Sequence, residues 1–196
     1  MCWSANGSLA TWVAGMTLAL ASNKQYDPVL WAFMVIFTQI QLVEYFLWKN
    51  LKVPRLNSLS SKAGLFVILL EPIAAIYMIK NKNLRNNFLI TYGLYITGVL
   101  LTHRFDFSTK VGINGHLEWN WLIPFWKALP WFVFLLAPMW IGGENNGTFL
   151  FSIITLLMTL YFYFRYKTAG TMWCWIAVFA WIFYFFKSAG LRNLRV

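Results

Sequence analysis

The sequence predicts an all-α integral membrane protein, a compact bundle of seven transmembrane helices joined by short loops. Hydrophobic residues make up 60% of the chain and charged residues 11%, too little charge to cover the surface of a soluble domain of this size. The apolar runs approach the ~20 residues that a helix needs to cross a bilayer. They are continuous, without the alternation of a membrane β-barrel. The lipid bilayer is therefore the expected partner.

Charged residues and Gly- or Asn-rich breaks divide the chain into apolar segments that we predict to be spans. These segments are 4–22, 28–48, 63–80, 86–102, 119–141, 148–164 and 170–187. No linker or low-complexity tract separates them, so we expect a single transmembrane domain over residues 1–196.

The first segment could be mistaken for a signal peptide, because Ala19-Leu20-Ala21 resembles a cleavage site. No Lys or Arg precedes its apolar stretch, and signal peptides normally open with basic residues. We therefore expect an uncleaved span. Ser4, Ser8, Gly15 and Ala19 recur in it at helical spacing and predict a face of small residues that permits close helix packing.

A polar stripe marks the second segment. Thr38, Gln41, Glu44 (or Tyr45) and Trp48 follow one another at steps of three or four, which places them on one helical face. An ionised glutamate facing lipid would cost several kcal/mol. The stripe is therefore expected to face protein or a wet cavity.

Two further charges fall inside predicted spans. Glu71 lies roughly 12 Å into the third segment at the helical rise, and Lys127 lies about as deep in the fifth. Either charge alone would be expensive in a membrane, so the sequence predicts an ion pair between them. Pro124, Pro130 and Pro138 should bend the fifth helix beside this pair.

An odd number of crossings brings the scarce metal-ligating residues to one side of the membrane. Cys2, Glu44, His103, His116 and Cys174 all fall near helix ends that share a side with the N-terminus. Zinc accepts thiolate, imidazole and carboxylate ligands, and copper accepts the same soft donors. No CxxC or HExxH spacing supports a metal site, so two simpler readings stay open. The cysteines would be apolar packing residues or form a disulfide, and the histidines would be solvated.

The excess of basic residues suits a membrane setting. Sixteen Lys and Arg against six acids give a net charge of +10, which favours contact with anionic headgroups next to the spans. The basic residues are scattered between spans and form no groove-reading motif. We expect no nucleic-acid partner.

The segments "MCWSANGSLA", "QLVEYFLW" and "MWCWIAVFA" resemble a family of uncharacterised multi-span membrane proteins from bacteria and large DNA viruses. Members of that family begin Met-Cys-aromatic-Ser, carry a Gln-x-x-Glu-x-x-x-Trp helix, and open their last span with Trp-Cys. The matching positions are Cys2, Ser4, Gln41, Glu44, Trp48, Trp173 and Cys174, with His116 as a further match. Glu71 departs from the pattern, because the family has Trp or Gln before this proline. The resemblance implies a multi-span membrane protein and names no reaction.

These residues support three functional hypotheses. The first is binding or translocation of a proton, ion or small solute through a polar intramembrane site, with a homo-oligomer as one way to form a pore. That site would comprise Ser4, Gln41, Glu44, Trp48, Glu71 and Lys127.

The second hypothesis is a membrane-embedded enzyme acting on a lipid-like substrate through a metal or thiol. Glu44 would be its general base, and Cys2, His116 and Cys174, with His103 in addition, its zinc or copper ligands. The third is an accessory subunit of a membrane complex.

Overall fold

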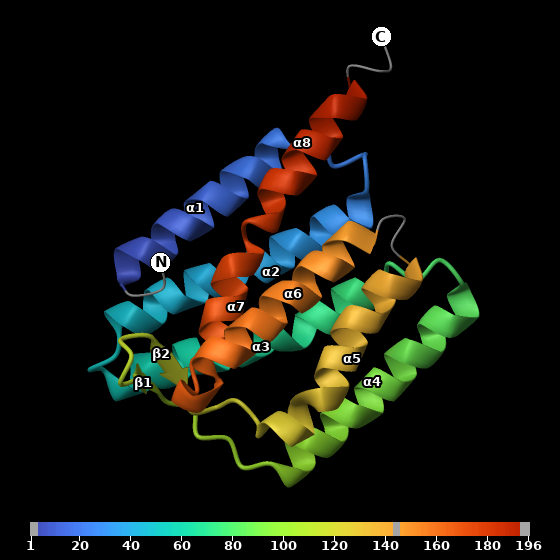
Figure 1. Cartoon of the computed structure of the whole chain (residues 1–196). Coiled ribbons are helices and arrows are strands. Elements are labelled where there is room, and N and C mark those ends of the chain that lie inside the picture. The colour runs from blue at the N-terminus through green and yellow to red at the C-terminus, as the bar shows by residue number, and fades with distance from the viewer. Residues whose placement is uncertain (1–3, 143–145, 193–196) are drawn as a thin grey trace.

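The computed structural model describes residues 4–142 and 146–192 and is almost entirely helical over them (Figure 1). Its elements are α1 (Ala5–Ala21), α2 (Pro28–Lys49), α3 (Pro54–Ile76), α4 (Lys82–Thr102), β1 (Thr109–Val111), β2 (Leu117–Trp119), α5 (Phe125–Gly142), α6 (Asn146–Tyr163), a 3₁₀ turn (Phe164–Tyr166), α7 (Ala169–Ala177) and α8 (Ala180–Arg192). The predicted all-α bundle is confirmed, with α7 and α8 forming one broken seventh helix.

Five helices are long and apolar enough to cross a membrane, which makes the chain a multi-pass membrane protein. Three of them are α2 (Pro28–Lys49), α3 (Pro54–Ile76) and α5 (Phe125–Gly142). The fourth is α6 with the 3₁₀ turn that follows it (Gly147–Tyr166), and the fifth is α7 with most of α8 (Ala169–Ala189). The other two predicted spans correspond to α1, which is short at 17 residues, and to α4, which begins with the polar sequence Lys82-Asn-Leu-Arg-Asn-Asn.

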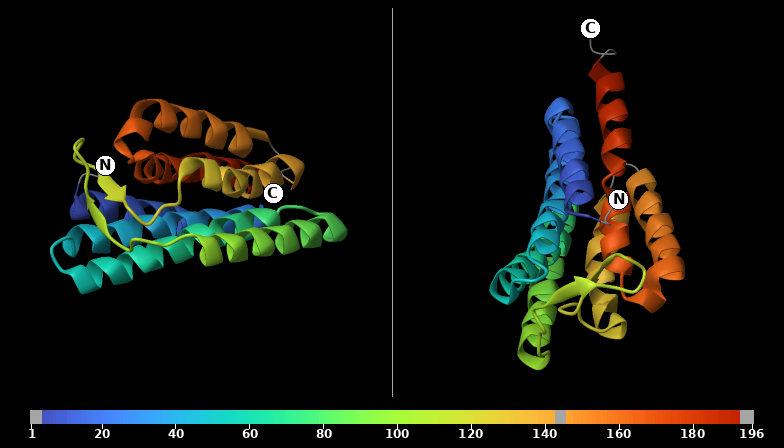
Figure 2. Two further views of the ribbon diagram at one scale, coloured as in Figure 1. Left: turned by 90° about the horizontal axis from the view of Figure 1, so that it is seen from below. Right: turned by 90° about the vertical axis from the view of Figure 1, so that its left-hand side faces the viewer.

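The helices form two layers (Figure 2). The first layer holds α1 to α4 in chain order, and the second holds α5, α6 and the α7–α8 helix. The layers meet where α3 packs on α5, α2 on α7 and α1 on α8. The ring of Phe37 on α2 packs edge-on against Trp173 of α7, with ring centres 5.7 Å apart, so buried hydrophobic residues of the two layers meet at this boundary.

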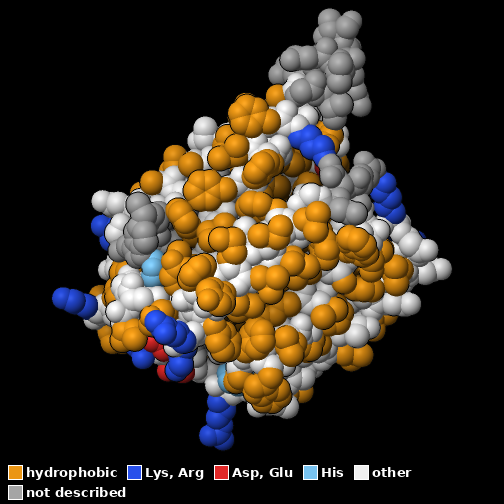
Figure 3. Space-filling model, viewed as in Figure 1, with side chains coloured by type: hydrophobic (Ala, Val, Ile, Leu, Met, Phe, Trp, Pro, Cys, Tyr) orange, Lys and Arg blue, Asp and Glu red, His pale blue; other side chains and the backbone are white. Residues whose placement is uncertain are grey.

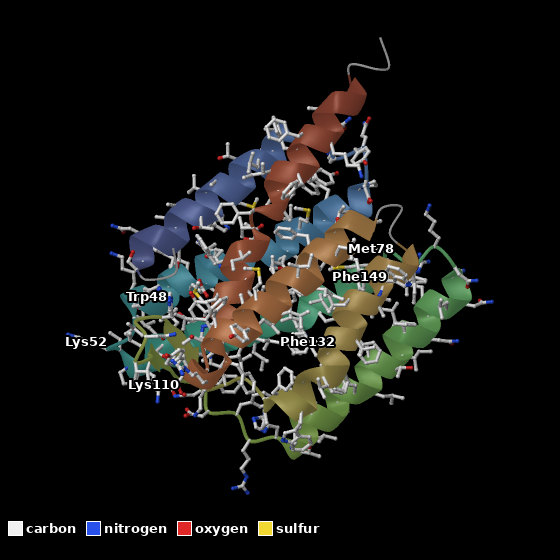
Figure 4. All side chains as sticks on the ribbon, in the orientation of Figure 1. Trp48, Lys52, Met78, Lys110, Phe132 and Phe149 are labelled. Atoms are coloured by element: carbon white, nitrogen blue, oxygen red, sulfur yellow. The ribbon has the colours of Figure 1, made fainter. Side chains whose placement is uncertain are left out.

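Successive helices run in opposite directions, so the bundle has two distinct ends (Figure 1). At the hairpin end, α1, α3, α5 and α7 begin and the β1–β2 hairpin lies. At the far end, α2, α4 and α6 begin. In Figure 4, Trp48, Lys52 and Lys110 lie toward the hairpin end, whereas Met78 and Phe149 lie toward the far end. This is the threading that seven helices predict.

A broad apolar surface covers the face over α5, α6 and α7, with Lys and Arg side chains at its edges (Figure 3). The exposed apolar residues of α6 include Leu150, Ile154, Leu157 and Phe162, each at least half exposed. Such a continuous surface would be a liability in water. In a bilayer it is the surface that lipid chains contact.

The predicted face of small residues on α1 is where this helix packs. Ser8, Gly15 and Ala19 are its buried residues. A Cβ atom added at Gly15 would lie 2.8 Å from Cγ2 of Thr38 and 3.0 Å from Cγ1 of Val178. Glycine is therefore what lets α1 approach both α2 and the seventh helix.

The seventh helix is broken between α7 and α8. Here the amides of Val178, Phe179, Trp181 and Ile182 donate to carbonyls three residues earlier, at 3.0–3.2 Å. A stretch of 3₁₀ geometry inside a helix often marks a hinge. The break lies beside Gly15 and Thr38, at the middle of the two-layer core.

The β-hairpin is the main feature that the sequence did not predict. β1 and β2 pair antiparallel, with Thr109 opposite Trp119, inside what looked like a loop over 103–118 and the start of a span at 119. The fifth helix consequently begins at Phe125 rather than at 119. This shift changes the position of Lys127, as described below.

Candidate functional site

The polar stripe of α2 faces the core, as its spacing predicts. Thr38, Gln41 and Glu44 are 1%, 0% and 0% exposed, and they occupy three successive turns of the helix. Their burial places a carboxyl group between the two layers. Trp48, the fourth member of the stripe, is half-buried near the hairpin end.

Glu71 brings a second carboxyl group into the same region. It lies on α3, which packs along α2, and it is 0% exposed. Neither of its carboxylate oxygens has a hydrogen-bond partner in the described part of the chain. Glu71 lies within range of electrostatic interaction with the hydroxyl of Tyr92, on α4.

Cys174 of α7 completes this group from the second layer. Cys174 is 3% exposed, and it lies within range of electrostatic interaction with both Glu71 and Glu44. We call Glu44, Glu71 and Cys174 the acidic core. It joins α2, α3 and α7 at the boundary between the layers.

The predicted ion pair between Glu71 and Lys127 is wrong. Lys127 lies in the first turn of α5, and its ammonium nitrogen is 5.2 Å from the ring centre of the exposed Trp126. Among the described residues, the salt bridges join Glu118 to Lys110 and to Lys167, at 3.5 and 3.8 Å. The prediction failed because the residues before Phe125 form a strand and a turn, so Lys127 is not deep in a helix.

Pro72 shapes the helix next to Glu71. Proline has no amide hydrogen, so the carbonyl four residues earlier, that of Ile68, loses its helical donor. The indole nitrogen of Trp131, on α5, donates to this carbonyl at 3.0 Å. The hydroxyl of Tyr92 donates to the next carbonyl, that of Leu69, at 2.9 Å. Two neighbouring helices therefore fix the backbone turn before Glu71.

A small cavity adjoins the polar stripe on the side toward the far end. Its volume is about 20 Å³, enough for one water molecule. Thr38, Thr148 and Ser152 supply polar groups to a lining that is otherwise largely aromatic. The indole nitrogen of Trp181 donates to the Thr38 hydroxyl at 2.8 Å, so this tryptophan lies at the boundary of the cavity.

A much larger cavity of about 1290 Å³ opens at the far end of the bundle. Met34, Met139, Thr148, Phe151 and Ala180 line both cavities. The two spaces are therefore adjacent, and together they extend from the far end to Thr38.

The hairpin closes the other end of the bundle. Asn57, near the start of α3, donates to the Thr109 carbonyl and accepts from the Thr109 amide, both at 2.8 Å. The Thr109 hydroxyl also contacts Ser61 and accepts from the indole of Trp121, each at 3.0 Å. On the α7 side, the hydroxyl of Thr171 donates to the Leu117 carbonyl at 3.0 Å. The hairpin thus bridges the two helical layers.

The proposed metal ligands do not form a cluster in the described part of the chain. Cys2 lies outside the described residues. His116 is buried in the hairpin with its ring edge-on to Tyr163, and His103 caps α4 with its ring against Phe105. Within residues 4–142 and 146–192, no three His, Cys, Asp or Glu side chains could hold a metal ion together. Cys174 is a free thiol, so a disulfide through it is not formed.

Ser4 has a local structural role. It is the N-cap of α1, where its side chain accepts a hydrogen bond from the Gly7 amide at 3.1 Å. The residue is exposed, and its capping bond satisfies an amide that would otherwise lack a partner.

Sequence reasoning missed two tryptophans next to the site. No role was predicted for Trp131 or Trp181, yet both are buried and donate hydrogen bonds to acceptors in the core. The sequence held a signal for Trp131, because Pro72 leaves the Ile68 carbonyl without its helical donor and so predicts a donor from a neighbouring helix. The Thr38–Trp181 pair, 143 residues apart, left no such signal.

Comparison with known proteins identifies no relative: no family model, no curated protein and no solved structure matches the chain. The resemblance to the family that begins Met-Cys-aromatic-Ser therefore stays a prediction. The geometry above characterises the chain as a helical multi-pass membrane protein with a buried acidic core.

Proposed function

We propose that this membrane protein binds a proton or a small cation at the acidic core and passes it between the two ends of the bundle. The observation that carries the proposal is the burial of Glu71 without a hydrogen-bond or ion-pair partner in the described part of the chain. An isolated carboxylate in a low-dielectric interior is strongly disfavoured. A bound proton or cation removes that cost, which makes Glu71 the natural binding group.

The two cavities support a route to this group from the far end. The large cavity leads to the small one, and the small one ends at Thr38. From Thr38, the polar stripe continues through Gln41 to Glu44, roughly 9 Å along α2 at the helical rise. Polar side chains at successive turns can relay a proton or replace water around a cation.

The contacts at both ends of this route fit a closed state. Trp181 and its neighbours narrow the passage beside Thr38, and the docked hairpin covers the other end. The break between α7 and α8 lies next to Trp181. A small rotation of α8 about this break would move the indole without disturbing α7, and alternating closure of this kind is how many transporters work.

Labelling with dicyclohexylcarbodiimide tests whether Glu71 binds an ion. This apolar reagent modifies protonated carboxyl groups within membranes, and peptide mass spectrometry locates the adduct. We expect an adduct at Glu71 in liposomes near neutral pH, and none at this position in Glu71→Gln. If the bound ion is a metal cation, adding that cation should slow the labelling. A protein that never forms the adduct at Glu71, in liposomes or in detergent, would contradict the proposal.

A further inference from the structure

The large cavity at the far end has the size and composition of a binding site in its own right. Its volume of about 1290 Å³ exceeds the roughly 300–1,000 Å³ of common small-molecule sites. The starts of α2, α4 and α6, the ends of α3 and α5, and one face of α8 surround it. The cavity therefore lies at the depth where helices begin, which in a bilayer is next to the headgroups.

Its walls are mainly apolar and open toward lipid. Leu30, Met34 and Met139 line the inner part. Phe183 and Phe186 of α8 also line it and are 66% and 68% exposed, so this wall reaches the outer surface of the bundle. An acyl chain entering from the bilayer would contact apolar side chains along the whole path.

The described part of the cavity rim carries more basic than acidic side chains. Among the described residues that line it, Arg85, Lys187 and Lys80 are basic and Asp27 is acidic. The Asp27 carboxylate already caps α2, where it accepts from the Leu30 amide at 2.9 Å. The guanidinium of Arg85 lies over the Tyr77 ring at 5.5 Å and makes no ion pair with any residue of the described part.

Backbone dipoles add to this charge. α2, α4 and α6 all begin around the cavity, and the amino end of a helix carries a partial positive charge that favours anions. At this end of the bundle, basic side chains and helix dipoles therefore act in the same direction.

From these observations we infer that the cavity binds an anionic phospholipid. Its chains occupy the apolar space between α2, α5 and α8, and its phosphate lies at the rim that Arg85 and Lys187 line. The inference does not depend on ion binding at Glu71, because none of the acidic-core residues lines the cavity.

Native mass spectrometry with added lipid tests this inference. Protein in detergent is titrated with phosphatidylglycerol and with phosphatidylcholine of the same chains, and the bound fraction is read for each. We expect tighter binding of phosphatidylglycerol by the wild type. In the double variant Arg85→Gln, Lys187→Gln, the preference should fall by about fivefold for each charge removed.

Two further variants separate the cavity from general surface charge. Lys52→Gln with Arg55→Gln removes two exposed cations at the hairpin end and should leave binding unchanged. Val29→Trp puts a large side chain on the cavity wall and should reduce binding of both lipids. Thermal unfolding in detergent checks that each variant is folded. The inference is overturned if the wild type shows no preference, if the hairpin-end pair weakens binding as much, or if folded Val29→Trp binds normally.

Discussion

The indole nitrogen of Trp181 donates a hydrogen bond to the hydroxyl of Thr38 across 2.8 Å, joining residues 143 positions apart. Trp181 is 0% exposed and Thr38 is 1% exposed, so the bond is shielded from solvent. It connects the broken seventh helix to the polar stripe of α2 at the cavity boundary.

Replacing Trp181 with Phe should loosen this closure. The variant loses the donor and part of the ring, and we expect a loss of about 1 kcal/mol in the free energy of unfolding. Ion flux into liposomes should rise, because the passage beside Thr38 is wider. Trp175→Phe is a matched control: Trp175 donates to the Thr11 hydroxyl at 3.2 Å, away from the cavities. It should lower stability similarly without raising flux.

The contact between Asn57 and Thr109 should be needed to hold the hairpin. Asn57→Ala removes the side chain that bonds the amide and carbonyl of the buried Thr109. We expect the free energy of unfolding to fall by about 2–3 kcal/mol. Amide hydrogen exchange should increase at Thr109 first. Asn50→Ala, which removes an exposed amide bonded to the Phe46 carbonyl, is the control and should change little. Equal exchange at Thr109 in both variants would argue against this anchor.

Gly15 should tolerate no side chain. An added Cβ would meet Thr38 at 2.8 Å, so Gly15→Ala should lower the free energy of unfolding by about 1–3 kcal/mol as α1 moves away. A Cβ atom added at Gly93 on α4 has no other atom within 4 Å. Gly93→Ala should therefore be neutral or stabilise the protein by up to ~1 kcal/mol. Thermal unfolding of the two variants in the same detergent measures the contrast. A Gly15→Ala protein as stable as Gly93→Ala would show that α1 packs differently.

Exchanging the charges of Glu71 and Lys127 should not restore the protein. Glu71→Lys places a cation in an interior built around a carboxyl group and should unfold the bundle. Adding Lys127→Glu should not help, because Lys127 sits in the first turn of α5 beside Trp126. Lys127→Gln alone should be well tolerated. Expression and gel filtration of the single and double variants check this prediction. A double variant that folds when Glu71→Lys alone does not would contradict it and support an ion pair between Glu71 and Lys127.

The sequence was sufficient to predict an all-α bundle and to predict which face of α2 points inward. Continuous apolar runs define spans, and the spacing of Thr38, Gln41 and Glu44 can bury all three only on one side. The burial of Glu71 also followed from the cost of a charge facing lipid.

The hairpin could not be predicted, because its stability depends on distant residues. Leu117 and Glu118 were expected in a loop, and Trp119 was expected to begin a span. They form a strand because Thr109 is held by Asn57 and Leu117 by Thr171. The position of Lys127 was wrong for the same reason, since the end of the strand decides where α5 begins. Long-range pairs of this kind leave no periodic pattern in a sequence.

Ion flux into proteoliposomes is the most direct test of the central claim, that Glu71 binds the ion which the bundle passes. The wild type, Glu71→Gln and the control Glu118→Gln, whose carboxylate pairs with Lys110 and Lys167 in the hairpin region, are reconstituted at equal density. A pH-sensitive or cation-sensitive dye inside the vesicles reports the rate. We expect flux in the wild type and in Glu118→Gln, and a loss of at least tenfold in Glu71→Gln, since a tenfold change needs about 1.4 kcal/mol. Equal rates in the wild type and Glu71→Gln, whether high or no faster than empty vesicles, would contradict the account.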